Sequence, residues 1–503
     1  MKLSVLTGWR RHGLAALLGL FSAGMFPPFG ITPLLLLYGA LYWMVAPQAG
    51  AKHGLRTVFA TAWWFFLGQF TSGLYWIANA LLIPPADFLW LLPLAVVAIP
   101  AGLALFPAII LTLWSRIEGR SALGFAVALM LAELARGHLL TGFPWNLAGY
   151  AFPHILALQQ LASVGGAYLL SFLAILLGVL PAALDRRAMA AWVLLLALPL
   201  AWGSWRLEQT VVASTDTMIR IIQPNIPQHQ KWDPALQAAN FRDHVALSRR
   251  PSSKPLAAVI WGETATGYPV EIVEDARRAA TAAVPPGGSL ITGTIRYLTR
   301  DRPPTVTNGM VVLDQDGSLL GAFDKFHLVP FGEYVPGRRW LPLPAVAADG
   351  LDFTAGTGPR TLRVPGLPAF APLICYEVIF PGAVIDEADR PSWLLNLTND
   401  GWYGYSTGPF QHFHITALRA IEEGMPMVRV ANTGISGMVD PLGRTLAKIG
   451  LSERGILDLD LPKALESPTF YGRYRDLPLA LALFAAMAIV ACRLYRRHQR
   501  EEK

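Results

Sequence analysis

The chain has 503 residues, of which 53% are hydrophobic and only 15% are charged, and its net charge is +7. This composition excludes an ordinary soluble globular protein and predicts membrane-spanning segments. The basic residues gather at the ends of apolar runs rather than among aromatic residues in one patch, so we expect a membrane and no nucleic acid as the partner.

Long apolar runs fill the first 212 residues and return near the C-terminus. A helix needs about 20 apolar residues to cross the hydrocarbon core of a membrane. The first run continues into residues 26–30 without a cleavage pattern of small residues, so we expect it to be retained rather than removed as a signal peptide. The sequence predicts about eight spans, near 12–30, 31–47, 56–80, 88–114, 121–140, 160–184, 188–206 and 477–493.

The basic residues of the short connections predict the orientation of these spans. Lys and Arg in such loops accumulate on the cytoplasmic side of a membrane. With a cytoplasmic N-terminus, seven spans place residues 213–465 outside the cytoplasm, and the eighth span returns the chain. The residues that carry this prediction are Lys52 and Arg56, Arg116 and Arg120, Arg186 and Arg187, and a tail with Arg493, Arg496, Arg497, Arg500 and Lys503.

Charge density divides the chain into three parts. Residues 1–212 are predicted to form a membrane domain with seven transmembrane helices, and residues 213–465 a water-facing domain of ordinary charge density. Residues 466–503 hold the last span and the basic cytoplasmic tail. The two cysteines, Cys375 and Cys492, fall in different parts, so no disulfide is expected.

The water-facing domain alternates strand-like and helix-like segments, which indicates a layered α/β fold. Predicted strands cover 218–222, 257–261, 289–294, 309–313, 370–376, 393–397 and 427–431, and predicted helices cover 233–248, 272–283 and 409–423. Within 308–325, the pair Asp316-Gly317 predicts a hairpin in which both residues supply positive φ angles.

Three side chains with catalytic chemistry each follow a predicted strand. Glu263 can have its pKa raised by burial and act as a general base, or can be a solvated loop residue. Lys325, flanked by two Phe, either snorkels or is held by carboxylates such as Glu263 or Glu333. Cys375 suits nucleophilic attack on a carbonyl with backbone N–H groups behind it, although most such cysteines are small core residues.

The order Glu, Lys, Cys, each at a strand end of one α/β domain, resembles the nitrilase superfamily. The resemblance implies a four-layer αββα sandwich. It implies that Glu263 is the base, that Lys325 stabilises the oxyanion and that Cys375 is acylated. It further implies that Glu333, in Pro330-Phe331-Gly332-Glu333, supports this triad.

Within that superfamily, residues 325–336, 396–403 and 223–226 are similar to the apolipoprotein N-acyltransferase branch, as is Lys231-Trp232. That branch moves a fatty acyl chain from a phospholipid to the N-terminal amine of the diacylglyceryl-cysteine of a lipoprotein. The resemblance implies these two substrates and a catalytic domain on the periplasmic side of the bacterial inner membrane. We expect no cofactor and a monomer. Further residues expected to bind substrate or support the triad are Tyr376, Glu377, Trp232, Asn399, Trp402 and Tyr403.

Three alternatives remain beside this prediction. Trp232, Trp402 and Tyr403 either form mobile flaps that face the bilayer or pack in the core. A membrane-tethered amidase or nitrilase-type hydrolase would let water deacylate the same thioester. A scaffold or transporter with an inactive domain is the alternative outside the enzymes, and the complete Glu-Lys-Cys set argues against it. No metal is expected, because His412 and His414 do not share a helix face, and both are expected to be structural or surface residues.

Overall fold

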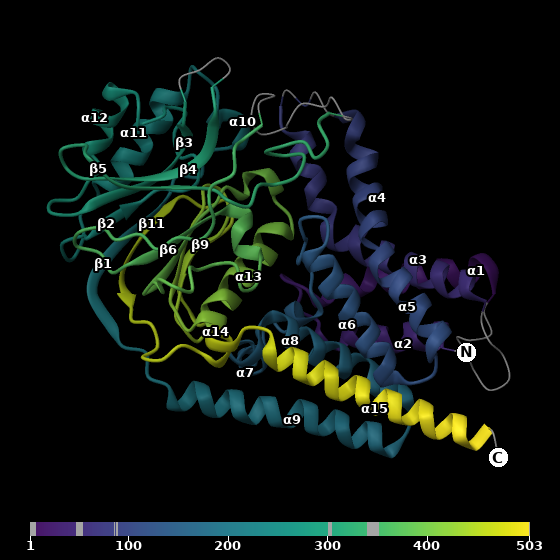
Figure 1. Ribbon diagram of the computed structural model, residues 1–503. Coiled ribbons are helices and arrows are strands. Elements are labelled where there is room, and N and C mark those ends of the chain that lie inside the picture. Colours follow the sequence, from purple (N-terminus) through teal and green to yellow (C-terminus); the bar gives the residue numbers. More distant parts are fainter. Residues whose placement is uncertain are drawn as a thin grey trace.

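The computed structural model describes residues 7–46, 54–84, 86, 89–299, 304–339 and 352–501. Lys52 and Lys503, which the orientation argument uses, lie outside the described residues, as do the side chains of Arg497 and Arg500. An α/β part built on two sheets stands against a bundle of helices, and both chain ends lie at the far end of that bundle (Figure 1).

Two sheets form the centre of the α/β part. Their strands are β1 Ser214–Gln223, β2 Ala258–Ile260, β3 Ser289–Tyr297, β4 Val306–Leu313, β5 Leu319–Asp324, β6 Phe370–Ile374, β7 Trp393–Leu397, β8 Met427–Val430, β9 Ser436–Val439, β10 Thr445–Ile449 and β11 Gly455–Pro462. The first sheet has the order β11-β1-β2-β3-β4-β5 and the second β10-β9-β8-β7-β6. β1, β2 and β3 are parallel, as are β6, β7 and β8, so the carboxyl ends of each set meet at one edge.

The sheets pack face to face, and helices cover their outer sides. Ile219 and Ile291 of the first sheet share a buried core with Leu395 and Val428 of the second. Helices α11 (Gln237–Ser248) and α12 (Glu274–Thr281) pack on the outer side of the first sheet. Helix α13 (Gly408–Glu423) packs on the outer side of the second sheet. The four layers are therefore α, β, β, α, as expected for the nitrilase-like domain.

All seven predicted strands and all three predicted helices of this part are present, whereas β9, β10 and β11 were not predicted. The predicted hairpin joins β4 and β5, which are antiparallel. Only Gly317 of its turn has a positive φ, at 76°, so the expectation for Asp316 is wrong. The Asp314 side chain instead closes the turn by accepting hydrogen bonds from the backbone of Asp316 and Ser318.

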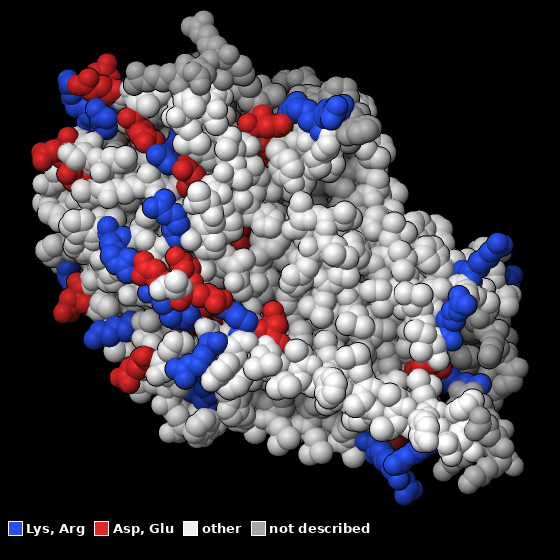
Figure 2. All heavy atoms as spheres, in the orientation of Figure 1, with Lys and Arg blue, Asp and Glu red and all other residues white. Residues whose placement is uncertain are grey.

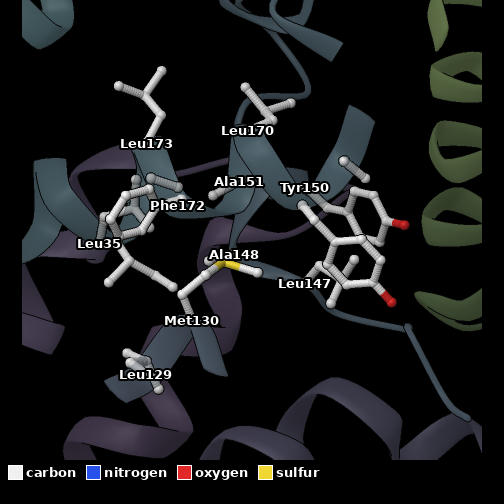
Figure 3. Packing of buried hydrophobic residues seen from close by; sticks show 14 of the residues in the cluster. Leu35, Leu129, Met130, Leu147, Ala148, Tyr150, Ala151, Leu170, Phe172 and Leu173 are labelled. Atoms are coloured by element: carbon white, nitrogen blue, oxygen red, sulfur yellow. The ribbon is translucent and has the colours of Figure 1, made fainter. Parts of the chain in front are cut away.

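The helix bundle has an apolar core that continues into the layer between α13 and the second sheet. Its helices are α1 Gly8–Ser22, α2 Leu36–Val45, α3 Leu55–Leu74, α4 Leu92–Leu103, α5 Leu105–Ile117, α6 Ala122–His138, α7 Leu156–Gln159, α8 Ala162–Val179 and α9 Arg186–Gln209, and the chain ends with α14 Phe470–Tyr474 and α15 Leu477–Glu501. Leu35, Met130 and Phe172, from helices far apart in sequence, are buried around Ala148 (Figure 3). Packing between distant helices makes the bundle one body.

Among the described residues, four helical segments are long and apolar enough to cross a membrane: Leu89–Ile117, Ala162–Ala183, Arg186–Gln209 and Leu477–Arg496. The prediction of eight spans is corrected to four by this measure. The other four predicted spans contain α1, α2 and α6, which have 15, 10 and 17 residues, and α3, whose Thr, Ser, Gln and Trp residues lower its hydropathy. The apolar runs read from the sequence also included the non-helical or 3-10 segments at their ends.

Charge is unevenly spread over the surface. Figure 2 shows charged side chains gathered over the α/β part and at the far end of the bundle, with an uncharged belt between them. Large apolar side chains are exposed on α9, including Leu194 and Leu198, and on α15, including Leu481 and Phe484. Such a continuous apolar surface is typical of contact with lipid.

Candidate active site

Three strand ends bring the expected catalytic side chains together. Glu263 follows β2, Lys325 follows β5 and Cys375 follows β6, and all three side chains are buried. Because β5 runs in the same direction as β3, its end lies at the same edge as that of β2. The Lys325 Nζ lies 3.9 Å from Glu263 Oε1, and both groups act electrostatically on the Cys375 thiol.

Carboxylates hold Lys325 in this pocket. Its Nζ donates a 2.8 Å hydrogen bond to Glu333 Oε1. The Asn308 side-chain amide donates to Glu263 Oε1 at 2.7 Å and to Glu333 Oε1 at 3.0 Å, so it bridges the two carboxylates. Burial alone would lower the pKa of Lys325, but Glu333 and Glu263 outweigh burial and raise it above its ordinary value. Lys325 therefore remains a cation in the site and does not extend to solvent.

The thiol of Cys375 is protonated at neutral pH. Burial and the nearby Glu263 raise its pKa to about 12, and Lys325 only partly opposes them. The residue opens a 3-10 helix, Cys375–Ile379, with φ at +51°, a left-handed conformation that is uncommon for a residue other than glycine. A nucleophile in this state needs a base beside it.

Glu263 has the properties of that base. Burial raises the pKa of its carboxyl group, and Lys325 opposes this shift. Its Oε1 is taken by Asn308, while Oε2 has no hydrogen-bond partner among the described residues. One carboxylate oxygen is therefore held in place and the other is free to accept a proton.

A buried network lies behind the thiol. The Thr398 side chain is hydrogen-bonded to Cys375 and also donates to Asp400 Oδ1 at 3.2 Å. Arg429 donates to Asp400 Oδ2 at 2.7 Å, and His412 Nδ1 lies 2.9 Å from Oδ1. Burial would raise the pKa of Asp400, but Arg429 and His412 hold it at about 2. The Asp400 carboxylate is thus ionised, and it holds Thr398, which is hydrogen-bonded to Cys375.

Glu377 joins the segments that carry Lys325 and Cys375. Its Oε1 accepts hydrogen bonds from the backbone of Phe326 and His327, at 2.6 and 3.2 Å. Its Oε2 accepts from the backbone of Ile374 at 2.6 Å. Burial raises the pKa of Glu377 to about 8, against the effect of these three donors. The side chain is structural and does not face the pocket as an acid or base.

The helix bundle supplies one side of the site. The Tyr376 hydroxyl donates to the backbone oxygen of Gly142 at 3.2 Å, in the connection after α6. The ring of Tyr403 lies 4.3 Å from that of Trp76 and 6.0 Å from that of Trp145. Gln411 of α13 accepts a 2.7 Å hydrogen bond from the Trp145 indole. The side chains expected to be catalytic therefore lie next to the junction of the two parts of the molecule.

Two family signatures match the chain. The apolipoprotein N-acyltransferase N-terminal domain matches residues 18–180, and the carbon-nitrogen hydrolase domain matches residues 218–469. An apolipoprotein N-acyltransferase of Rhodopseudomonas palustris is 37% identical over 516 residues, which cover 97% of this chain and 96% of that protein. The chain belongs to the apolipoprotein N-acyltransferase family. Another member, from Bradyrhizobium diazoefficiens, is 40% identical over 522 residues, covering 98% of this chain and 96% of that protein.

Among solved structures, a mutant amidase of Nesterenkonia from the nitrilase superfamily is similar to part of this chain. It shares 20% sequence identity, covers 50% of this chain and 94% of the amidase, and has a TM-score of 0.37.

The remaining expected residues differ in their exposure. Asn399 is buried and donates to Gln228 Oε1 at 2.8 Å, which ties its segment to the short helix α10 (Gln228–Lys231). Trp232 follows α10 and is partly exposed, and Trp402 is half-buried. Tyr403 packs between the two parts of the molecule, as described above. For Tyr403 packing is thus observed, and the flap remains a prediction for Trp232 and Trp402.

Several residues of the site were not predicted. Asn308 is a buried polar residue within strand β4. A polar residue beside a strand-like apolar run is visible in the sequence and could have marked it. Thr398 and Asp400 lie in the segment 396–403 that carries the family resemblance, but no pattern links them or Arg429 to Cys375, because that link is purely tertiary. His412 and His414 are fully buried, so the surface alternative for them is wrong. Within the described ranges no group of three or more His, Cys, Asp or Glu side chains could hold a metal ion.

Proposed function

We propose that this chain transfers a fatty acyl chain from a phospholipid to the N-terminal amine of the diacylglyceryl-cysteine of a lipoprotein, with Cys375 holding the acyl chain between the two steps. The observation that carries this proposal is the meeting of Glu263, Lys325 and Cys375 in one buried site beside the helix bundle. The relatives named apolipoprotein N-acyltransferase, similar over nearly the whole chain, support the two substrate classes.

In the first step, Cys375 Sγ attacks the ester carbonyl of the phospholipid while Glu263 removes the thiol proton. The free Oε2 of Glu263 and the raised pKa of the thiol support this assignment. Lys325 offers its positive charge to the oxyanion that forms, and donors of this kind contribute about 3–4 kcal/mol. When the tetrahedral intermediate collapses, the C–O bond breaks, and the lysophospholipid leaves with the proton from Glu263.

In the second step, the lipoprotein amine attacks the thioester carbonyl in the same pocket. Glu263 takes a proton from the attacking nitrogen, and Lys325 again faces the oxyanion. The C–S bond breaks, and the departing sulfur of Cys375 recovers the proton from Glu263. Cys375 is again a free thiol and Glu263 is again ionised, and one amide bond has replaced one ester bond.

Mass spectrometry of the protein after incubation with phospholipid alone tests this proposal. We expect a hydroxylamine-sensitive acyl group on Cys375 and release of lysophospholipid before any acceptor is added. Cys375→Ala is expected to abolish both, while Cys492→Ser, which changes the other free cysteine, keeps them. Transfer that requires donor and acceptor together, with no acyl group ever trapped on Cys375, would overturn the covalent mechanism. Rapid release of free fatty acid without an acceptor would favour the hydrolase.

We further propose that the enzyme is a monomer of the bacterial inner membrane with residues 213–465 as its periplasmic catalytic domain, residues 1–212 as its membrane domain and residues 466–503 as its last span and cytoplasmic tail. The uncharged belt of Figure 2 supports a membrane around the bundle. A reporter active only outside the cytoplasm is expected to work after Trp205 or near Pro462, and to fail after Arg187 or Arg497. Activity at Arg187 would contradict this orientation.

A further inference from the structure

A second buried cation, Lys231, lies beside the triad, and the mechanism above does not use it. Lys231 is the last residue of α10 and is only 4% exposed. Its Nζ donates two 2.9 Å hydrogen bonds, one to the backbone oxygen of Glu263 and one to Thr264 Oγ1. Burial lowers the pKa of Lys231 to about 8, with Glu263 and Cys375 acting in the opposite direction. The amine therefore remains charged at neutral pH and below.

The charges of the pocket show what this cation changes. Glu263 and Glu333 are two carboxylates, and Lys325 is the cation that pairs with them. The groups that act on the Glu263 carboxylate are Lys325, Glu333 and Lys231, and the two lysines lower its pKa. Two other nearby acidic groups already have partners of their own. Asp400 pairs with Arg429, and Glu377 accepts hydrogen bonds from three backbone N–H groups. Without Lys231 the Glu263, Glu333 and Lys325 group would carry one excess negative charge.

Lys231 also joins the segment that carries Trp232 to the turn that carries Glu263. The ring of Trp232 lies 5.7 Å from the Lys231 Nζ. Thr264, which accepts one of the two hydrogen bonds, has φ at +41°, so the turn that carries Glu263 is in an uncommon conformation that needs support from its neighbours. Burial, together with the charge of Lys231, lowers the pKa of His244 of α11 to about 4, which leaves this neighbouring ring neutral.

We propose that Lys231 is a positioning residue of the acyltransferase site, which fixes the turn of Glu263 and supplies the charge that keeps this base ionised. The inference rests on the proposed roles of Glu263 and Cys375. It assigns Lys231 no contact with the reacting atoms. Loss of its charge raises the pKa of Glu263, so a larger fraction of the base is protonated at a given acidic pH and cannot accept the thiol proton.

The test is the pH dependence of Cys375 labelling by iodoacetamide, in a Cys492→Ser background so that a single thiol reacts. In Lys231→Met the acidic limb of the profile is expected to move up by about one pH unit, which on the limb is about a tenfold slower reaction. The plateau at neutral pH is expected to fall severalfold, because both hydrogen bonds to the turn of Glu263 are lost. Lys254→Met is the matched control, because Lys254 is exposed and pairs with Asp460. Its profile is expected to stay unchanged.

Other outcomes would overturn the charge assignment. An unchanged midpoint in Lys231→Met contradicts it, as does a loss of rate by the same factor at every pH, which a merely structural residue would cause. Lys231→Arg keeps the charge, so a midpoint displaced as far as in Lys231→Met also contradicts it.

Thr264→Val tests the positioning role and remains informative if Lys231→Met does not fold. It leaves Lys231 charged and removes one of its two acceptors. It is expected to lower kcat for acylation severalfold at unchanged KM and to leave the labelling midpoint in place, and unaltered acylation would contradict the positioning role. Failure of the proposed function would look different, because the unsubstituted enzyme itself would then carry no acyl group on Cys375.

Discussion

Glu377 accepts a 2.6 Å hydrogen bond from the backbone N–H of Phe326, although the two residues are 51 positions apart. Phe326 directly follows the cation Lys325, and Glu377 follows the proposed nucleophile Cys375 by two residues. The same carboxyl group accepts a hydrogen bond from the backbone N–H of Ile374, on the other side of Cys375. One buried side chain thus sets the spacing between the nucleophile and the cation proposed to face its oxyanion.

Glu377→Gln is expected to slow acylation of Cys375 by roughly 10- to 100-fold. The new amide group places an N–H donor against a backbone donor, and an unmade buried hydrogen bond costs about 1–3 kcal/mol. The rate of lysophospholipid release before acceptor is added measures this effect. Glu466→Gln, at an exposed position, is the matched control and keeps the original rate. Acylation at the original rate in Glu377→Gln would show that the spacing tolerates loss of this bond.

The acylation rate is expected to fall on the acidic side at a pH above the ordinary pKa of a glutamic acid. Burial raises the pKa of Glu263, so the carboxyl group becomes protonated, and useless as a base, at a higher pH than in solvent. The rate therefore rises with pH through the folded-state pKa of Glu263 and then levels. Lysophospholipid release over pH 4.5 to 8 gives this profile. Glu263→Gln is expected to react slowly and to show no fall in rate on the acidic side. If the rate of this variant still falls at acidic pH, the titrating group is not Glu263.

Asp400→Asn is expected to destabilise the fold by about 3–5 kcal/mol, because it leaves the buried Arg429 without its carboxylate. In the folded protein the pKa of Asp400 is about 2, against 3.8 for an ordinary aspartic acid. Its contribution is thus complete above about pH 4 and is lost as the pH falls toward 2. Denaturant unfolding at several pH values measures this difference. Asp316→Asn, in the exposed hairpin turn, is the control, and equal stability of the two variants would refute the argument.

Trp402→Ala is expected to weaken acyl transfer from phospholipid while sparing the reaction of Cys375 with a small soluble thiol-reactive probe. Trp402 is half-buried in the segment next to Tyr403, which packs against the bundle. A residue at a mouth that opens to the bilayer affects entry of the lipid but not the chemistry of the thiol. Trp205→Ala, an exposed tryptophan on α9, controls for loss of an aromatic surface group. Equal loss of both reactions in Trp402→Ala would point to a structural role.

Most strands and the three longer helices of the α/β part could be predicted from the sequence, because their apolar patterns are local and need no knowledge of the partner; β9, β10 and β11 were missed. The same patterns placed Glu263, Lys325 and Cys375 at strand ends, where an edge of parallel strands brings side chains together. The family resemblance then predicted that these three residues form one site. The apolar runs predicted too many membrane spans, because hydropathy along the chain does not tell where a helix ends.

Only the tertiary structure decided which groups surround these three residues. Strand β11 pairs with β1 across more than 200 residues, and the indole of Trp145 reaches Gln411 across 266. The bridge made by Asn308 between Glu263 and Glu333, and the contact of Lys231 with the turn of Glu263, likewise join separate elements. A buried polar side chain must find its partner wherever the packed chain supplies one, and this requirement acts through space rather than along the sequence. The sequence by itself determined most strands and helices of the α/β part, and packing determined the electrostatic surroundings of Glu263, Lys325 and Cys375.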